Sequence, residues 1–187
     1  MHGSDVSQIR TDLLLDALAE AGRTGRYSTG TPKLVAQVLA EIPVFAGLND
    51  RHRRRIAERA EIAEIRAGEA IVREGFTGQA AYVLLTGAAR VERGGETVVE
   101  VGRGAIVGEL CLLTGEARSA TVTAVRDLWV LRIKRETFRR LLEQEPTIAL
   151  HLLENLARRL WVAVMANGTS PAIIGRMHAP YARHRRS

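Results

Sequence analysis

Residues 108–122 read Gly-Glu-Leu-Cys-Leu-Leu-Thr-Gly-Glu-Ala-Arg-Ser-Ala-Thr-Val, and no other segment of the chain contains as much chemical information. The segment combines a glycine, a carboxylate at Glu109 and, nine residues after it, Arg118 beside Ser119. The glycine lets the backbone approach a ligand closely, and residues 109–113 can form one helical turn whose first N–H groups favour an anion. Because Glu109 itself would repel a phosphate, its carboxylate must face a different group.

This set of groups matches a phosphodiester attached to a sugar. A guanidinium fork offers two parallel charge-assisted hydrogen bonds to phosphate oxygens, and a carboxylate can accept a hydrogen bond from a ribose hydroxyl. We therefore predict a binding site made of Gly108, Glu109, Leu110, Cys111, Arg118 and Ser119. Leu110 and Cys111 would contribute backbone N–H groups, so the side chain of Cys111 is expected to be a small packed hydrophobe.

Three of these residues have a plain structural alternative. Arg118 could form a surface salt bridge with Glu116. Glu109 could cap the helical turn that follows it, and Ser119 could be a serine at a strand edge. Each alternative makes a different prediction about burial and hydrogen-bond partners.

Motifs on both sides extend the pattern: Ile-Pro-Val-Phe-Ala-Gly-Leu at 42–48, Ala-Gly-Glu at 67–69, Glu-Gly at 74–75, Tyr-Val-Leu-Leu-Thr-Gly at 82–87, and Val91. Together with residues 108–122 they resemble the cyclic nucleotide-binding domains of bacterial cyclic AMP receptor proteins, of the regulatory subunits of cAMP-dependent protein kinase, and of cyclic nucleotide-gated channels. The resemblance covers residues 40–165, and residues 108–122 are similar to the phosphate-binding cassette of this family.

The resemblance implies that Glu109 accepts a hydrogen bond from the ribose 2′-hydroxyl and that the ligand is cAMP. cGMP is a second possibility, since a serine at the position of Ser119 contacts the guanine amino group in some members. Two departures from the family pattern, Phe76 for an acidic residue and Val107 for an aromatic one, are expected to alter packing and not binding. Candidates to contact the base are His151, Asn155, Arg158 and Trp161.

Composition narrows the class of protein. The 187 residues fit one domain with appendages, 46% of them are hydrophobic, and no apolar run is long enough to span a membrane. A single cysteine excludes an internal disulfide framework and offers no metal-cluster spacing. We expect a cytoplasmic protein, or the cytoplasmic part of a larger one. The net charge of +6 comes almost wholly from arginine, and we attribute it to a solvated surface and a basic pocket.

The pattern along the chain predicts an α+β fold. Helices are expected at 9–21, 33–41 and 50–60, the last capped by Asn49, and again at 135–145 and 147–165. Between them, short apolar runs separated by glycines predict seven strands: 63–66, 70–73, 81–85, 88–93, 97–101, 120–125 and 128–133. This order indicates an antiparallel β-roll, a jelly-roll-like barrel, flanked by N-terminal helices and two C-terminal helices.

Three regions follow from this pattern: a helical extension with a flexible linker at 1–40, a nucleotide-binding domain at 41–166, and a basic, disordered tail at 167–187. In the last helix, Leu150, Leu153, Ala157, Leu160 and Val164 form a heptad-like apolar seam. A second apolar face contains residues 148, 152 and 156. The seam predicts a homodimer, and the alternative is a helix buried within a monomer.

Four functions compete at this stage. The first is a sensor in which the nucleotide shifts the last two helices and so acts on an effector that the sequence does not identify. A transcription factor is disfavoured because only about twenty residues follow Met165, too few for a helix-turn-helix, so direct DNA binding requires a longer protein. No nucleophile, base and acid assemble in the pattern, so we do not expect an enzyme. The fourth is a dimerising interaction module that binds no ligand.

Overall fold

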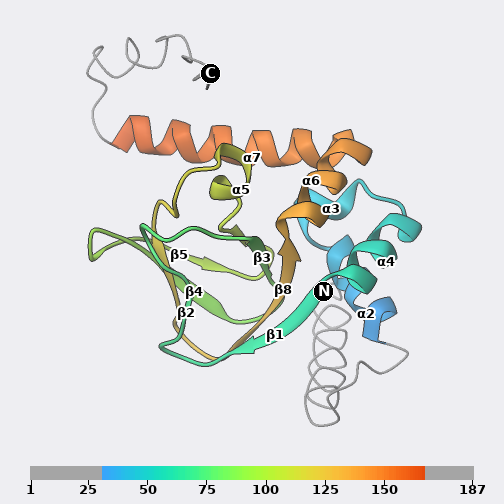
Figure 1. The fold of residues 1–187 in the computed structure, drawn as a ribbon, viewed down its shortest axis with the longest axis horizontal. Helices are drawn as coiled ribbons and strands as arrows, with labels where there is room; N and C mark the ends of the chain where they lie inside the picture. Colours follow the sequence, from blue (N-terminus) through green and yellow to red (C-terminus); the bar gives the residue numbers. More distant parts are fainter. Residues whose placement is uncertain (1–30, 167–187) are drawn as a thin grey trace, which may run out of the picture. The chain divides into compact units, whose positions relative to one another are not determined.

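The computed structural model describes residues 31–166, which divide between two compact units, 1–149 and 150–187 (Figure 1). The predicted helix at 9–21 and the predicted tail at 167–187 lie outside the described residues.

The first unit contains two four-stranded antiparallel sheets, ordered β1-β8-β3-β6 and β2-β7-β4-β5. Their strands are β1 (Glu61–Ile65), β2 (Ala70–Val72), β3 (Ala80–Leu84), β4 (Ala88–Arg93), β5 (Glu96–Gly102), β6 (Ile106–Val107), β7 (Thr121–Ala124) and β8 (Leu128–Lys134). All seven predicted strands are present, and the α+β β-roll is confirmed. The sheets do not close into a barrel, and β6 was not predicted because two residues are too few to show an alternation.

Alternation along the strands builds the core between the two sheets. On β8, Leu128 and Val130 are fully buried while Trp129 between them is half-buried. Leu84 of β3 and Ala89 of β4 belong to the same buried cluster. The cassette, residues 108–122, follows directly after β6, whose two residues are buried. The packed strands therefore fix the position at which the cassette begins.

The sequence Gly94-Gly95 between two of these strands predicts a hairpin, and the structure contains it. β4 and β5 pair along their whole length and are joined at Gly94 and Gly95. Both glycines have positive φ angles, 60° and 83°, as a two-residue turn of type I′ requires. A second turn is held by Asp127, which accepts hydrogen bonds from the Ala67 N–H (2.8 Å) and from Arg66 (3.0 Å). These two donors lower the pKa of Asp127 below its ordinary value.

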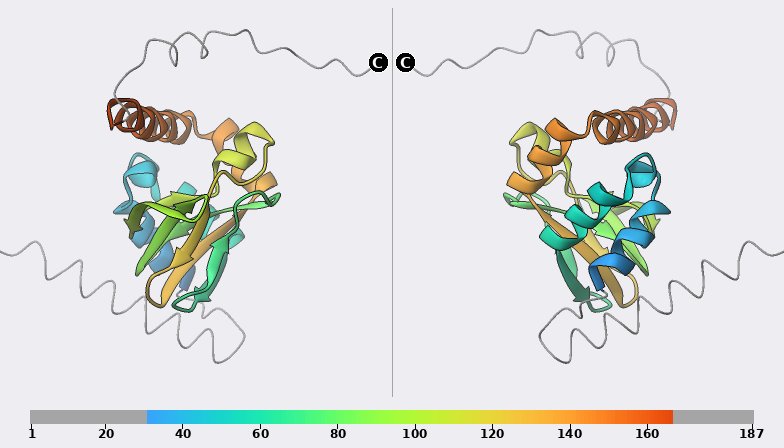
Figure 2. Two further views of the ribbon diagram at one scale, coloured as in Figure 1. Left: turned by 90° about the vertical axis from the view of Figure 1, so that its left-hand side faces the viewer. Right: turned by 90° about the vertical axis from the view of Figure 1, so that its right-hand side faces the viewer.

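Four helices of this unit gather at one end of the roll: α2 (Thr31–Ala40), α3 (Pro43–Ala46), α4 (Asp50–Arg59) and α6 (Arg135–Gln144) (Figures 1 and 2). The predicted cap of α4 is confirmed, since the Asn49 side chain accepts from the His52 N–H at 3.0 Å. The one-turn helix α3 was not predicted, because Pro43 hides the helical spacing of so short a segment. It places Phe45, which is 1% exposed, in the interior.

The described part of the second unit, residues 150–166, belongs entirely to helix α7 (Pro146–Ala166), whose first four residues lie in the first unit. The leucines of the predicted seam are exposed: Leu150 by 60%, Leu153 by 63% and Leu160 by 47%. For residues 150–166, both the homodimer and its alternative, a seam buried within the monomer, stay predictions. No described helix is both long and apolar enough to cross a membrane.

Candidate functional site

The predicted site lies where the chain turns from a strand into a short helix. β6 ends at Val107, and Gly108 has a φ of +76°, a conformation that favours glycine. Helix α5 (Leu110–Thr114) follows at once and ends at Gly115, whose φ of +81° closes it as a left-handed C-cap. Two glycines thus bracket a single turn of helix: the turn after Gly108 was predicted from the sequence, whereas its end at Gly115 was not.

Arg118 is buried, with 7% of its surface exposed. One of its terminal nitrogens, Nη1, donates to the Gly108 carbonyl, and the other, Nη2, donates to the Ala80 carbonyl at 2.6 Å. The alternative, a surface salt bridge to Glu116, is therefore wrong. The guanidinium is held inside the site by the first residue of the cassette and by strand β3.

The backbone on either side of this guanidinium is fixed as well. The Arg118 N–H donates to the Phe76 carbonyl and the Gly75 N–H donates to the Arg118 carbonyl, both at 2.9 Å. These two bonds join the cassette to the turn between β2 and β3. The departure from the family pattern at Phe76 leaves this link intact, because the link uses the Phe76 backbone while its side chain is 67% exposed.

Two glycines make room for the arginine. A Cβ atom at Gly78 would lie 2.0 Å from Nη2 of Arg118, and one at Gly108 would lie 2.2 Å from Nη1. Real Cβ atoms do not come so close to another heavy atom, so either side chain would displace the guanidinium. In the sequence, Gly78 fits only a turn position of the family that the chain resembles, and its contact with Arg118 is visible only in the structure.

Glu109 is the second buried charged residue of the site, with 2% of its surface exposed. It occupies the N-cap position of α5, but its side chain makes no capping hydrogen bond, so the capping alternative is wrong. Within residues 31–166, Glu109 and Arg118 are the only charged residues in the buried class. Burial of charge is unfavourable and is often retained for a functional reason.

The remaining predicted residues differ in exposure. Leu110 is 39% exposed and Ser119 is exposed, whereas Cys111 is 2% exposed. The Cys111 thiol lies 3.6 Å from the Gly78 carbonyl oxygen and 3.7 Å from that of Gly108. The structure therefore gathers Gly108, Glu109, Cys111 and Arg118 around one turn and leaves Ser119 at the exposed entrance to β7.

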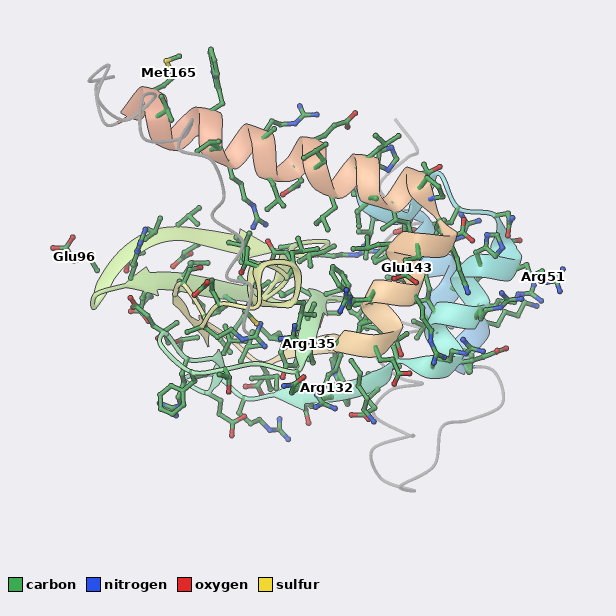
Figure 3. The ribbon with its side chains drawn as sticks, turned by 45° about the horizontal axis from the view of Figure 1, so that its top comes forward. Arg51, Glu96, Arg132, Arg135, Glu143 and Met165 are labelled. Carbon is green, nitrogen blue, oxygen red and sulfur yellow. The ribbon has the colours of Figure 1, made fainter. Side chains whose placement is uncertain are left out.

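Arg135, the first residue of α6, joins this cassette to the helices and was missed from the sequence. Its Nη2 donates to the carbonyls of Gly78 (3.0 Å) and Cys111 (3.2 Å), and its Nη1 donates to Leu112 (3.3 Å). Its Nε donates to the Gln79 side chain at 3.1 Å, and its backbone N–H donates to the Gln79 carbonyl at 2.7 Å. In Figure 3, Arg135 lies between α6 and the α5 turn.

Two of the carbonyls that Arg135 contacts, those of Cys111 and Leu112, belong to α5, and a cation is favoured near the last carbonyls of a helix. Only the position of Arg135 at the start of a predicted helix was visible in the sequence, and many arginines share such positions. The candidates for contact with the base lie on α7 in the second unit: Asn155 and Arg158 are exposed and His151 is half-buried, while Trp161 is 65% exposed. Their roles remain predictions.

The donor set at this site suits an anionic sugar ligand and not a metal. No group of three or more His, Cys, Asp or Glu residues in the described part of the chain is arranged to hold a metal ion. A buried carboxylate, a buried guanidinium and the first N–H groups of α5 remain as the polar groups of the cassette. These groups can bind a sugar hydroxyl and a phosphate together.

Comparison with known proteins agrees with this chemistry. Residues 62–145 match the model of the cyclic nucleotide-binding domain family. A cAMP-dependent protein kinase regulatory subunit of Emericella nidulans is 35% identical over 123 residues, which are 65% of this chain and 28% of that protein. Residues 62–145 therefore form a cyclic nucleotide-binding domain.

Solved structures show the same fold. The catabolite activator protein of Thermus thermophilus superposes with a TM-score of 0.61 at 32% identity, over 66% of this chain and 61% of that one. The regulatory subunit of a cAMP-independent protein kinase A from Trypanosoma brucei has a TM-score of 0.60 at 26% identity, over 71% and 49%. The chain spans only 24–30% of the length of the first three curated relatives it matches.

Replacing Gly78 by alanine tests whether the position of Arg118 matters for binding. The φ of Gly78 is not positive, so alanine does not strain the backbone, and its Cβ would meet only the flexible end of Arg118. We expect the affinity for a cyclic nucleotide to fall by about 1–3 kcal/mol, the usual effect of an inserted methyl group that forces a side chain to move. The measurement is calorimetric titration, with the melting temperature as a check on folding.

Alanine at Gly94, in the exposed β4–β5 turn, is the control for this experiment. It is far from the cassette in the sheet order and has no atom near its Cβ, although its positive φ carries its own strain. If Gly78→Ala binds cAMP as tightly as the unchanged chain, then the guanidinium does not need its present position.

Proposed function

We propose that this chain is a regulatory module that binds a cyclic nucleotide, cAMP in the first place, and transmits the binding event to helices α6 and α7. The observation that supports this proposal most directly is the burial of Glu109 and Arg118 beside the short helix of the cassette. In this proposal Arg118 binds the cyclic phosphate and Glu109 accepts from the ribose. The N–H groups of Leu110 and Cys111 add to the phosphate site, and Ser119 lies next to it.

The fold alone does not select cAMP, since one structural neighbour belongs to a kinase named as cAMP-independent. The proposal of a nucleotide ligand therefore depends on the residues of the cassette, Arg118 above all. A half-buried monoanion needs a paired cation, and Arg118 presents a fork held at two points in the interior. cGMP would use the same phosphate and ribose contacts, so the identity of the base must be measured.

Arg135 supports the second half of the proposal. Four hydrogen bonds from its side chain connect α6 to α5 and to residues 78–79. A ligand that changes the position of α5 would change the acceptors of Arg135, and α6 would respond at its first residue. The ligand can shift this equilibrium only by its difference in affinity for the two positions.

The experiment that tests the function uses protein freed of nucleotide by unfolding and refolding. Calorimetric titration with cAMP and, separately, with cGMP is expected to give a dissociation constant of about 1 μM or lower for at least one of them, equivalent to roughly −8 kcal/mol. The ratio of the two constants gives the base preference. Folded protein that releases no heat with either nucleotide would overturn the proposal and favour an interaction module that binds no ligand.

Replacing Arg135 by alanine is expected to leave cAMP binding largely intact but to remove the response of α6 to bound cAMP. In the unchanged chain, cAMP should slow amide exchange in α6 by about 5- to 150-fold, the usual range for coupled sites. In Arg135→Ala this slowing should be lost, whereas the residues proposed to contact cAMP are all still present and affinity should fall much less. Hydrogen exchange with and without cAMP measures the first quantity, and calorimetry measures the second.

Arg139→Ala is the matched control, because Arg139 lies one turn further along α6 and is exposed. Arg135→Lys keeps the charge but lacks the fork, so it should restore only part of the response. The coupling role of Arg135 is wrong if Arg135→Ala and Arg139→Ala respond to cAMP alike.

We further propose that the exposed seam of α7 forms a homodimer. Leu150, Leu153 and Leu160 repeat at heptad spacing and are exposed by 47–63%. Leu153→Glu should place like charges opposite each other and convert the dimer to a monomer, which light scattering measures as a halving of the mass. Val98→Glu, at an equally exposed position on β5, is expected to leave the mass unchanged. A monomeric unchanged chain would contradict the seam.

A further inference from the structure

A groove lies between helices α4 and α6, outside the cassette. Its volume is about 270 Å³. The residues that matter for its chemistry are His52, Arg55 and Arg59 of α4, Arg140 and Leu141 of α6, and Glu145. Both helices belong to the first unit, so the groove is a feature of a single compact body.

Charge is distributed unevenly in this groove. Arg140 pairs with Glu136 at 2.6 Å, and His52 pairs with Glu145 at 2.6 Å. Arg55 and Arg59 make no ion pair with any residue of 31–166, although they lie one helical turn apart on the same face. Two like charges at this spacing destabilise a helix slightly.

The floor of the groove is apolar. Ile56, between the two arginines in the sequence, is 3% exposed, and Leu141 on the opposite wall is half-buried. Two unpaired guanidinium groups above an apolar floor are complementary to an amphipathic helix whose polar face is acidic. Arg51, which does not line the groove, points away from it on the outer side of α4 (Figure 3).

The same chain contains a segment with this pattern. Between residues 9 and 21, Asp12, Asp16 and Glu20 recur every four residues. The apolar residues of the same segment also follow helical spacing: Ile9, Leu13, Leu14, Ala17, Leu18 and Ala21. The acidic residues would lie on one side of the predicted helix, at the spacing that separates Arg55 from Arg59. The sequence predicted this helix, which lies outside the described residues, without indicating what it contacts.

The place where this segment joins the described structure favours the same groove. α2 begins at Thr31 and packs against α4, which forms one wall of the groove. Residues 22–30 connect the segment to α2, and nine residues can span up to roughly 30 Å. The connection is therefore long enough to reach the groove from the adjoining helix.

We propose that residues 9–21 dock as an acidic amphipathic helix in the α4–α6 groove and pair their carboxylates with Arg55 and Arg59. Leu13 and its apolar neighbours would then cover Ile56 and Leu141. The groove would be an intramolecular docking site, occupied by the N-terminal segment of the same chain.

If the proposed function is correct, the docking of residues 9–21 is coupled to cAMP binding. The wall formed by α6 begins at Arg135, which is bound to the cassette. If cAMP shifts α6, it must change the affinity of the groove for residues 9–21, and the docked segment must change the affinity for cAMP by the same factor. The docking itself does not depend on the nucleotide.

The test measures amide exchange in residues 9–21 of the full chain without nucleotide. Docking should slow this exchange, and the double variant Arg55→Glu, Arg59→Glu should accelerate it by roughly tenfold, since two ion pairs are replaced by two repulsions. Adding Asp12→Arg and Asp16→Arg to that variant reverses both charges and should restore slow exchange. The control is Arg51→Glu with Arg54→Glu, which has the same change in charge on α4 outside the groove.

Fast exchange of residues 9–21 in the unchanged chain would overturn the proposal. So would slow exchange that both double variants of α4 leave unchanged, because the segment would then be held elsewhere. Repeating the measurement with cAMP distinguishes the docking of residues 9–21 from its proposed coupling to nucleotide binding. If the restored charge-swapped chain is protected but cAMP has no effect, the docking stands and the regulatory consequence is wrong.

Discussion

Arg118→Leu is expected to abolish cyclic nucleotide binding while the protein remains folded. The guanidinium is the one buried cation of the described chain, and it lies beside the first residue of the cassette. Without it, the phosphate would be buried and unpaired, which should reduce affinity by about 2–5 kcal/mol, or roughly 30- to several thousand-fold. A site with a dissociation constant of about 1 μM would then weaken to roughly 30 μM or, at the upper end of this range, to several mM, where calorimetry detects no binding.

Folding must be monitored in this variant, because leucine removes the two guanidinium donors of the buried Gly108 and Ala80 carbonyls. An unsatisfied buried acceptor costs about 1–3 kcal/mol, so some loss of stability is expected together with the loss of binding. Arg126→Leu is the control: this arginine is exposed in the turn between β7 and β8 and should affect neither property. Unchanged binding in folded Arg118→Leu would show that the phosphate is bound elsewhere.

Phe45→Ala is expected to reduce the free energy of unfolding by about 3–5 kcal/mol, the usual loss for a large aromatic side chain removed from an interior. Phe45 is 1% exposed, and its neighbours Ile42 and Leu48 are also buried. A domain of this size is stable by about 5–15 kcal/mol, so the loss is a large fraction of the total. Urea unfolding measures it as a lower midpoint.

Phe76→Ala provides the matched control, since the same side chain is removed from a position that is 67% exposed. Its effect should stay within about 0.5 kcal/mol, as is usual for surface positions. If both phenylalanines respond equally, α3 does not pack as part of the core.

The parts of the fold that were predictable have strong local signals. Seven strands were identified because β-type runs end at glycines, and Gly94-Gly95 identified one hairpin because the turn needs two positive φ angles. β6 and α3 were missed because segments of two and four residues are shorter than one period of any pattern. Their positions depend on partners distant in the sequence.

Some residues of the site were predictable from the sequence, and others were not. Glu109 and Arg118 were found because their spacing belongs to a local motif. The contacts of Gly78 and Arg135 could not be predicted, since they join segments 40 residues apart for Gly78 and 23 or more residues apart for Arg135, which meet only after the sheets form. Of the alternatives at the site, burial decided against the salt bridge of Arg118, and the missing hydrogen bond decided against the cap at Glu109.

Cys111 gives this domain a natural chemical label. It is the only cysteine of the sequence, it is 2% exposed, and its sulfur faces the carbonyls of Gly78 and Gly108. A thiol reagent can reach it only when the α5 turn separates from the β2–β3 connection, so the labelling rate counts those separations directly. The rate at which Cys111 is labelled can therefore report the opening of the cassette, and no reporter group needs to be introduced.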